Sequence, residues 1–564
     1  MKSTIFYILL SVYIYALPQG INTLIQKSGI PKKDISIYIK ESGSGGQVIA
    51  SLNAEQTRTP ASVIKVLTTY AALLKLGFHY RWPTKFYYTG NIRSGVLYGD
   101  LLVKGFGDPT LNDKDLDKIV SYIRAEGIHK ITGNIIIDRS YFRVGTKNNS
   151  GFDEHTYSAY NAMPDAMMFN ERISTVCVIP NKNNVYKKGA DESYKVINKL
   201  QRVNKPCKGR YSWPGVRIDK SQAVPTLLLQ GKISKRCGKR NICKVITKPY
   251  KSFYYALKNK LKKKGISVRG SLRLRKIPQH RAKELFTYYS KPLETIVSKT
   301  AKKSNNLYAR HLLLLLGAKV YGAPTTVNKG RKAIVKILKN YGALSQGVLK
   351  VDNGSGLSRS AKLSAKILAD VYDNAYIRYG QRWMNTLSIA GTDGTIKKRF
   401  RGTIVKNRAW MKTGTLKRVK NIGGYVKSKQ GRLYTTVILV QTNKGRWKAA
   451  KLQNNIMKWI VRYKSTTKIQ STQARNTHST LWEMETTSPE KISNERYYVQ
   501  TGMFTLKPSK TYLQKIEHLG LPYKVRYSQN YKVYIGAYSQ EKDARRVLKQ
   551  VRKHINKGAF IVKM

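Results

Sequence analysis

The sequence is short of acidic residues: 30 Asp and Glu stand against 105 Lys and Arg in 564 residues, a formal net charge of +75. Such an excess of cations is typical of proteins that bind nucleic acid or an anionic surface. It does not indicate a disordered polybasic chain, because 41% of the residues are apolar and 38 are tyrosines, enough to build hydrophobic cores. At roughly 150 residues per domain, the length suggests about three or four domains.

Several common motifs are also missing. The sequence has no HExxH motif and no cluster of His with acidic residues, so we expect no metal and no cofactor. The glycine-rich segment 42–46 lacks the spacing of a phosphate-binding loop. The four cysteines form no CxxC pair, and their even number suits an oxidising compartment. We favour disulfides Cys237–Cys243 and Cys177–Cys207, while four reduced, buried cysteines are an equally open alternative.

No segment beyond the N-terminus is long and uncharged enough to span a bilayer, which takes about 20 apolar residues. The N-terminus has Lys2, an apolar run over 4–16 and then Leu17-Pro18-Gln19-Gly20. This pattern is typical of a secretory signal peptide, so we expect residues 1–20 to direct export to the periplasm. A buried N-terminal helix or an uncleaved anchor is the alternative. Export argues against nucleic acid as a partner.

The middle of the chain alternates between helical and strand-like patterns. Short strands and turns dominate residues 87–280, which we expect to form inserted β-rich domains. The segments on either side, 21–86 and 281–464, have mixed α/β character and are expected to form one domain. Within it the patterns predict a hairpin over 35–53 and helices over 62–76, 295–321, 331–340 and 361–378.

The C-terminal part divides into a linker and a small domain. Residues 465–495 hold 12 Ser or Thr in 31 residues without apolar periodicity, which predicts a flexible linker. Residues 496–564 contain two similar stretches, Tyr497-Tyr-Val-Gln-Thr-Gly-Met-Phe504 and Tyr531-Lys-Val-Tyr-Ile-Gly-Ala-Tyr538, each followed by a helical segment and a strand. Two successive βαβ units predict a ferredoxin-like fold.

Three short motifs carry the chemistry, in the order SxxK (62–65), SxN (304–306) and KTG (412–414). One helical turn places the Lys65 amine beside the Ser62 hydroxyl, and a lysine whose pKa is lowered can serve as the base that a weak serine nucleophile needs. SxN offers a hydroxyl and an amide. KTG adds a positive charge, hydroxyls for a carboxylate and a glycine that lets the backbone approach a substrate. Each motif is common alone, but the ordered set is a strong signal of serine acyl-enzyme chemistry.

Together with three supporting motifs, these residues make segment 25–463 resemble the class C low-molecular-mass penicillin-binding proteins. These are D-alanyl-D-alanine carboxypeptidases and endopeptidases of the type-4 kind. The supporting motifs are Gly105-Phe-Gly-Asp-Pro-Thr-Leu111, Asp352-Asn-Gly-Ser-Gly-Leu-Ser-Arg359 and Gly391-Thr-Asp-Gly-Thr395. The resemblance implies a serine β-lactamase/transpeptidase-like fold in which the long gap between the SxxK and SxN motifs holds inserted domains.

The resemblance also implies a role for each catalytic residue. Ser62 would be the acylated nucleophile and Lys65 its general base. Ser304 would relay a proton to the leaving amine with electrostatic support from Lys412, and Asn306 would hold the substrate amide.

The remaining implied residues concern the substrate. Thr413 and Thr415 would bind its terminal carboxylate beside Gly414, and the backbone N–H groups of Ser62 and Thr415 would form the oxyanion hole. Asp352 and Arg359 would shape the pocket or, equally, only fix the Gly-rich turn. Asn170, in segment 169–171, would face the substrate side chain. Some relatives place an acid at the Asn170 position, which leaves selectivity for a diamino acid in doubt.

We therefore expect a carboxypeptidase that removes D-Ala from peptidoglycan stem peptides, with endopeptidase cleavage of crosslinks as a second activity and β-lactams as covalent inhibitors. The alternatives are a non-catalytic peptidoglycan-binding protein and a β-lactamase.

Residues 496–564 resemble a SPOR domain, a module that binds peptidoglycan glycan strands stripped of peptides. Strand alternation predicts that Gln500 shares a sheet face with Phe504 and that Tyr534 shares one with Tyr538, which we expect to bind sugar.

The positive charge is uneven: residues 231–280 contain 17 Lys or Arg and no Asp or Glu. One hypothesis is that this stretch holds the protein against an anionic envelope surface, a contact that salt would weaken. A generally basic exported proteome is the alternative.

Overall fold

The structure is a computed structural model, and it describes most of the chain between residues 17 and 563. The described ranges are 17–465 except 146, 148, 190 and 279, and 497–563 except 505–507, 518, 520, 522, 528–530, 539–540 and 557. Most of the expected signal peptide and linker therefore lies outside the described residues. The chain forms two compact units, 1–470 and 471–564. Within the described ranges, no helix is both long and apolar enough to cross a membrane, and no three His, Cys, Asp or Glu side chains group as a metal site would require.

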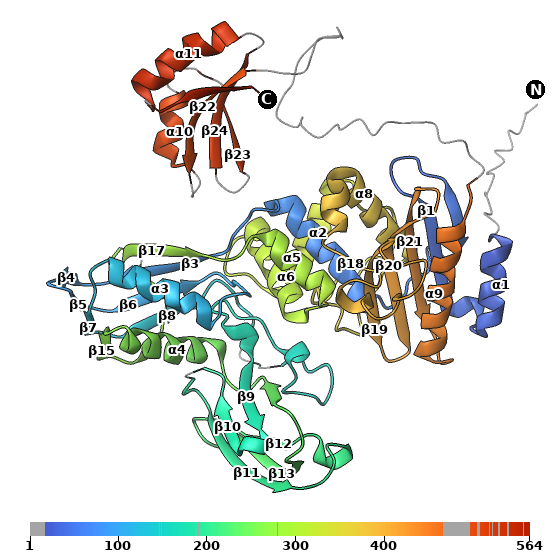
Figure 1. The fold of residues 1–564 in the computed structure, drawn as a ribbon, viewed down its shortest axis with the longest axis horizontal. Helices are drawn as coiled ribbons and strands as arrows, with labels where there is room; N and C mark the ends of the chain where they lie inside the picture. Colours follow the sequence, from blue (N-terminus) through green and yellow to red (C-terminus); the bar gives the residue numbers. More distant parts are fainter. Residues whose placement is uncertain are drawn as a thin grey trace, which may run out of the picture. The chain divides into compact units, whose positions relative to one another are not determined.

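The larger unit is built on a six-stranded antiparallel sheet that joins the two segments flanking the insert (Figure 1). The N-terminal strand β1 pairs with β21 along its whole length, and β1 and β2 form the predicted hairpin. In spatial order the strands are β18 (Ser388–Ile389), β19 (Ala409–Leu416), β20 (Val419–Lys427), β21 (Leu433–Gln441), β1 (Ile35–Glu41) and β2 (Val48–Leu52).

Helices cover both faces of this sheet, and each layer encloses its own hydrophobic core. One face carries α1 (Gln19–Ser28) and α9 (Arg446–Arg462). The other carries α2 (Lys65–Leu76), α5 (Leu293–Lys302), α6 (Asn306–Tyr321), α7 (Val327–Asn340) and α8 (Ala365–Met384). Short 3₁₀ turns lie at Lys32–Asp34, Ala61–Ile64 and Gly394–Ile396.

The single helix predicted over 295–321 is wrong, because the segment forms two helices, α5 and α6. Ser304 adopts a left-handed backbone conformation with φ of 54°, which ends the first helix. The Asn305 side chain then caps α6 by accepting a hydrogen bond from the backbone N–H of Tyr308. Apolar periodicity continues on both sides of this break, so the pattern alone conceals it.

The inserted block runs from β3 (Pro83–Tyr88) to β17 (Lys283–Tyr289), and it is not purely β-rich. Helices α3 (Asp113–Ala125) and α4 (Pro249–Lys263) share a core with two sheets, ordered β16-β8-β6-β3-β17 and β15-β7-β5-β4. The other strands of these sheets are β4 (Asn91–Arg93), β5 (Val96–Tyr98), β6 (Leu101–Gly105), β7 (Lys130–Ile131), β8 (Ile135–Asp138), β15 (Ser267–Val268) and β16 (Leu272–Leu274).

A second, smaller part of the insert consists of two three-stranded sheets, β10-β9-β14 and β11-β13-β12. Their strands are β9 (Ser174–Ile179), β10 (Asn184–Lys187), β11 (Lys195–Val203), β12 (Gly215–Asp219), β13 (Thr226–Ser234) and β14 (Arg240–Lys244). The predicted cysteine pairing is wrong: the disulfide joins Cys207 to Cys237, while Cys177 and Cys243 are free. Cys177 and Cys243 lie on the paired strands β9 and β14, where they face Asn241 and Thr175. Neither is therefore next to the cysteine that its spacing suggested, Cys207 or Cys237.

The smaller unit confirms the predicted βαβ repeat. Its antiparallel sheet has the order β23-β24-β22-β25 and packs against two helices. The elements are β22 (Tyr497–Phe504), α10 (Lys510–Glu517), β23 (Tyr523–Tyr527), β24 (Tyr531–Tyr538), α11 (Glu541–His554) and β25 (Phe560–Lys563).

The predicted face assignment in this sheet is wrong. Gln500 pairs directly with Tyr534 across the strands. Phe504 and Tyr538 instead pack against the core under the helices. Register shifts between residues 500 and 502 on β22, and a φ of 81° at Gly536 on β24, interrupt the simple alternation.

The sheet face opposite the helices therefore differs from the one expected, and Gln500 and Tyr534 on it are buried. Core residues Val499, Val533 and Ile535 face the helices, so Gln500 and Tyr534 point to the opposite side. There the Tyr534 ring meets that of Tyr498, at 6.3 Å between centroids.

Candidate active site

Ser62 lies in a tight turn at the entrance to α2, held from several sides. Ala61 has a left-handed backbone with φ of 49°, and the turn passes directly into the helix at Lys65. From strand β20, the buried Asn421 side chain donates hydrogen bonds to the carbonyls of Thr59 and Pro60, at 2.9 and 3.0 Å. The position of the Ser62 hydroxyl is thus set by contacts from distant parts of the chain.

Two glycines allow the backbone to come close to this turn. A Cβ atom at Gly356 would lie 1.9 Å from the Ala61 carbonyl oxygen, and its φ of 75° is one that other residues rarely adopt. At Gly414 on β19, a Cβ atom would lie 3.0 Å from the Ser62 nitrogen. The Gly-rich turn and the KTG strand therefore enclose the serine from two sides.

The Lys65 amine contacts three oxygens. Its Nζ lies 2.8 Å from Ser62 Oγ and 2.7 Å from Asn306 Oδ1, and it also hydrogen bonds to the Ser355 carbonyl. The side chain is fully buried, and burial, followed by the charges of Lys412 and Arg310, holds the pKa of Lys65 well below its usual range.

This geometry suits a neutral amine. A neutral amine has two N–H groups and one lone pair. The amide oxygen and the backbone carbonyl can only accept, so they use both N–H groups. The lone pair is then left for the Ser62 hydroxyl to donate into, which is the arrangement that proton abstraction requires.

A second lysine–serine pair lies beside the first. Lys412 Nζ donates hydrogen bonds to Ser304 Oγ at 3.0 Å and to the Thr413 carbonyl at 2.7 Å. Burial lowers the pKa of Lys412 to about 7, so near neutral pH this amine can exist in either protonation state.

The edge of β19 beyond Lys412 offers groups for an extended ligand. Within the described residues, β18 pairs with β19 only as far as Met411, which leaves Thr413 to Thr415 unpaired on that side. Thr413 Oγ1 lies 2.8 Å from the hydroxyl of Thr395, which belongs to the Gly391–Thr395 motif. Hydroxyls and free backbone N–H groups on a strand edge can bind a peptide that ends in a carboxylate.

The structure places Asp352 and Arg359 at different positions around the motif residues. Asp352 forms an ion pair with Arg331 of α7 and does not reach Ser62. It begins the Gly-rich turn, whose Ser355 carbonyl contacts Lys65. Arg359 lies over the ring of Phe152 and lines a pocket of about 410 Å³ beside Leu416 at the end of β19.

Asn170 is not brought together with the motif residues. Its side chain accepts a hydrogen bond from the backbone N–H of Asp113 at 3.1 Å, at the start of α3. It lines a separate pocket of about 530 Å³, whose walls include Glu171, Lys299 and Tyr308 but none of the SxxK or KTG residues.

Its neighbour Glu171, in contrast, reaches the SxN motif directly. Its carboxylate accepts hydrogen bonds from Asn305 Nδ2 at 3.0 Å, Lys299 Nζ at 2.5 Å and the Tyr308 hydroxyl at 2.9 Å. Burial, and then the Glu171 charge, raise the pKa of Tyr308, so the phenol remains a donor. Through Glu171, the insert thus contacts Asn305, the middle residue of the SxN motif, and the two helices on either side of it, α5 and α6.

The backbone around Glu171 supports this role. Asn170, Glu171 and Arg172 all have left-handed φ values of 48°, 52° and 60°. Such conformations cost about 1–3 kcal/mol each and persist only where surrounding contacts enforce them. The buried Arg172 supplies one such contact, donating to the Met163 carbonyl at 2.8 Å.

The insert makes a second contact at the same motif. The Tyr160 carbonyl accepts hydrogen bonds from Asn306 Nδ2 at 3.1 Å and from the buried Arg310 at 3.4 Å. The first orients the Asn306 amide so that its oxygen faces Lys65. No sequence motif marks Tyr160 or Arg310, and the motif 352–359, which contains Ser355, does not by itself indicate the contact of Ser355 with Lys65. These contacts join segments far apart in the chain.

A buried lysine beside a serine, a second lysine–serine pair and a KTG strand on an antiparallel sheet between helical layers define a serine acyl-enzyme hydrolase with the β-lactamase/transpeptidase fold. Comparison with protein families resolves the class further. Residues 17–466 match the D-Ala-D-Ala carboxypeptidase 3 (S13) family, so the chain belongs to this family. Residues 493–563 match the SPOR domain. The chain is a serine-type D-Ala-D-Ala carboxypeptidase with a C-terminal SPOR domain.

Similar proteins agree with this assignment. The chain is 27% identical over 432 residues to the D-alanyl-D-alanine carboxypeptidase DacB of Haemophilus influenzae, covering 73% of this chain and 86% of that one. It is 24% identical over 440 residues to the D-alanyl-D-alanine carboxypeptidase of Actinomadura sp. R39, covering 75% and 80%.

The fold is shared with a solved structure. The crystal structure of penicillin binding protein 4 (dacB) from Haemophilus influenzae matches with a TM-score of 0.67 and 24% identity, covering 78% of this chain and 99% of that one. A second structure of the same protein, complexed with a β-lactam, matches with a TM-score of 0.64 at 24% identity, over 79% of this chain and 100% of that one.

The Glu171 contacts lead to a first prediction. Glu171→Ala should slow acylation by penicillin about tenfold, because one hydrogen bond to a charged group contributes about 1.5–3 kcal/mol and the Asn305 side chain would lose its anchor. Glu171→Gln, which keeps an acceptor, should recover part of the rate. The acylation rate is measured by quenching the reaction at set times and determining the acylated fraction by mass spectrometry. Thermal unfolding of each variant reports its stability.

Glu294→Ala is the matched control. Glu294 lies on α5, the helix that also carries Lys299, and it pairs with Arg382 at 2.8 Å without contacting the SxN motif. The control should acylate at the wild-type rate. Equal rates in Glu171→Ala and wild type would contradict a positioning role for Glu171.

The two lowered pKa values lead to a second prediction, on pH dependence. Acylation should fall as the pH drops through the pKa of Lys65, because only the neutral amine accepts the proton. Below about pH 7 Lys412 is charged and opposes protonation of Lys65. Lys412→Gln removes that charge, so the pKa of Lys65 rises and the acid limb moves to higher pH.

The measurement is the second-order rate of β-lactam acylation from pH 4.5 to 9, on the order of ten points, for wild type and variants. Lys427→Gln is the control, since Lys427 is exposed at the end of the neighbouring strand β20 and is not among the charges that act on Lys65. An acid limb that stays in place in Lys412→Gln would be inconsistent with this coupling.

Proposed function

We propose that the enzyme removes the terminal D-Ala from peptidoglycan stem peptides through an acyl-enzyme on Ser62. The contact of Ser62 Oγ with the buried Lys65 amine carries the proposal. The substrate carboxylate binds the hydroxyls of Thr413 and Thr415, with Lys412 contributing positive charge. The peptide then extends along the free edge of β19.

Acylation follows from the same geometry. Lys65 takes the Ser62 proton as Oγ attacks the carbonyl carbon between the two D-Ala residues. The negative oxygen is stabilised by the backbone N–H groups of Ser62 and Thr415. The C–N bond breaks, and the proton that Lys65 took from Ser62 passes through Ser304 Oγ, next to Lys412, to the departing D-Ala amine. Lys65 is then neutral again.

Hydrolysis completes the cycle. A water molecule gives a proton to Lys65 and attacks the ester carbonyl, which returns Ser62 to its starting state and releases the shortened peptide. A β-lactam imitates the substrate up to the ester stage and remains attached to Ser62. The same steps on an amide whose amine belongs to a second peptide would be endopeptidase cleavage of a crosslink, our proposed second activity.

We further propose that the enzyme acts in the periplasm, as the basic and apolar N-terminal pattern suggests, and that its SPOR domain binds denuded glycan strands. On the face opposite the helices, the half-buried Tyr498 ring provides the aromatic surface that sugars favour, and Gln500 and Tyr534 beside it are 7% and 6% exposed. Such binding would hold the enzyme where amidases have already removed peptides.

The catalytic proposal is tested with Ser62→Ala. The wild-type protein should gain the mass of one penicillin on the peptide that contains Ser62 and should release D-Ala from a soluble D-Ala-D-Ala peptide. Ser62→Ala should do neither, since no other nucleophile contacts Lys65 among the described residues. D-Ala release that persists in Ser62→Ala would refute the assignment. Rapid turnover of the penicillin adduct would favour a β-lactamase.

The glycan proposal is tested by deleting residues 496–564, which belong to a separate compact unit. The shortened enzyme should sediment less with amidase-treated sacculi while keeping wild-type penicillin labelling. Full-length Ser62→Ala, which retains the module, serves as the control and should sediment like wild type. Unchanged sedimentation of the shortened enzyme would count against glycan binding by the module.

A further inference from the structure

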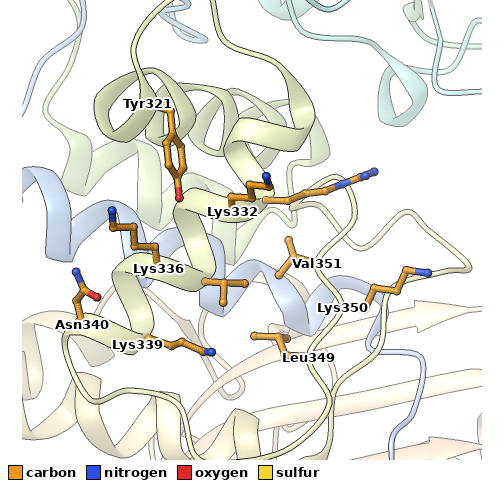
Figure 2. Close-up of a pocket in the computed structure, with 10 residues that line it drawn as sticks. Tyr321, Lys332, Lys336, Lys339, Asn340, Leu349, Lys350 and Val351 are labelled. Atoms are coloured by element: carbon orange, nitrogen blue, oxygen red, sulfur yellow. The ribbon is translucent and has the colours of Figure 1, made fainter.

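A basic groove lies on the catalytic unit, on the outer side of α7 (Figure 2). Its volume is about 550 Å³. Ten residues line it: Tyr321, Arg331, Lys332, Val335, Lys336, Lys339, Asn340, Leu349, Lys350 and Val351. Five of them are cations and none is acidic, so the groove has a strongly positive wall. We call this surface the α7 groove.

The arrangement of the groove follows from the helix. Lys332, Lys336 and Lys339 occur at spacings of four and three, which places them along one face and spreads their charges over about 10 Å. The opposite face of α7, with Ile334 and Ile337, is buried in the core. Figure 2 shows Lys336 and Lys339 on one side, Lys350 on the other, and Leu349 and Val351 between them.

The charges in the groove are poorly compensated. Residues 295–351 contain 11 Lys or Arg and no Asp or Glu. Lys332, Lys339 and Lys350 form no ion pair with any residue that the structure describes. The nearest acid along the chain, Asp352, is already paired with Arg331. An external anion is therefore the partner that would relieve the repulsion among these cations.

The basic stretch 231–280, in contrast, does not form one such surface. Lys260 pairs with Asp117 at 2.7 Å and Arg275 with Asp100 at 3.2 Å. Its other cations are spread over α4 and the strands β13 to β16. Among the described residues, the lining of the α7 groove has no acidic residue and brings together four cations that form no ion pair: Lys332, Lys336, Lys339 and Lys350.

The apolar residues at the bottom of the groove indicate which class of anionic ligand fits it. Val335, Leu349 and Val351 provide apolar contacts, and the Tyr321 ring lies 5.7 Å from Lys336 Nζ. A bare inorganic ion would use only the cations. A peptide with alternating methyl groups and carboxylates would use both the floor and the walls, and peptidoglycan stem peptides have this composition.

The groove is also connected to the catalytic lysine. Arg331 Nε donates to the Asp352 carbonyl at 2.6 Å and its guanidinium pairs with the Asp352 carboxylate. Three residues later, the Ser355 carbonyl contacts Lys65. The turn between them is kept rigid by the Asn353 side chain, which accepts from the backbone N–H of Ser355 at 3.0 Å. A ligand in the groove thus lies against the back of the active-site turn.

We propose that the α7 groove binds a second, uncleaved stem peptide of the wall polymer through its carboxylates. This deepens the proposed function, because it assigns the enzyme a site that distinguishes polymer from soluble peptide. A polymer carries many stem peptides on neighbouring strands, so one can fill the groove while another enters the active site. The gain in effective concentration then favours cleavage of intact wall.

The test compares two triple variants of the full chain that lose the same charge. Lys332→Gln, Lys336→Gln and Lys339→Gln are combined in one variant. Lys27→Gln, Lys32→Gln and Lys33→Gln, at exposed positions of α1 and the turn after it, are combined in the control. D-Ala release is measured from intact sacculi and from a soluble D-Ala-D-Ala peptide at low salt.

The groove variant should release D-Ala from sacculi about fivefold more slowly than the control, with equal rates on the soluble peptide. Added salt should reduce the difference, because ionic contacts of this kind are screened. Equal rates of the two variants on sacculi, or an equal loss on sacculi and soluble peptide, would overturn the proposal.

A binding assay that does not depend on catalysis tests the groove even if the proposed function is wrong. In a Ser62→Ala background, sedimentation with peptide-bearing sacculi should be weaker for the groove variant than for the control, whether or not the wild-type enzyme releases D-Ala. Short poly-L-glutamate should compete with this binding. Competition by polyphosphate but not by polyglutamate would overturn the assignment to carboxylates.

Discussion

The active site depends on keeping one lysine amine in a fully buried position. Taking an ammonium group out of water costs several kcal/mol, so Lys65 is held where its neutral form is favoured. The three oxygens around it then determine which group receives each N–H and leave the lone pair to Ser62. The positive charges of Lys412 and Arg310 nearby strengthen the same preference.

This constraint explains why segments so distant in sequence converge. Ser62 comes from the 3₁₀ turn Ala61–Ile64 and Lys65 from the start of α2. Asn306 comes from α6, Ser355 from a Gly-rich turn and Lys412 from β19. The glycines at 356 and 414 let the turn and the strand approach the nucleophile without a clash. The insert completes the arrangement, because the Tyr160 carbonyl orients the Asn306 amide and Glu171 anchors Asn305. The inserted block is therefore part of the catalytic architecture and not an independent appendage.

How much the sequence predicts depends on the range of the interaction. The SxxK contact lies within one helical turn, so spacing alone predicts the approach of Lys65 to Ser62. The hairpin over 35–53 and the βαβ repeat of the C-terminal unit are likewise local patterns. The break at Ser304, the Cys207–Cys237 disulfide and the contacts of Glu171 depend on long-range packing, which periodicity does not encode. In the SPOR sheet, a shift of register by one residue was enough to send Phe504 and Tyr538 to the opposite face.

The large positive charge also has a more specific distribution than its total suggests. Part of it is neutralised in ion pairs within the insert, while α7 presents an unpaired row of lysines above an apolar floor. The charges of Lys412 and Arg310 inside the active site have an additional effect, since they lower the pKa of Lys65.

The most direct test of this account is the protonation state of Lys65 itself. The ¹⁵Nζ chemical shift of Lys65, assigned by its disappearance in Lys65→Arg, should report a neutral amine at pH 7 in the uninhibited enzyme. A shift typical of a charged ammonium group at that pH would contradict the claim that burial prepares Lys65 to act as the base.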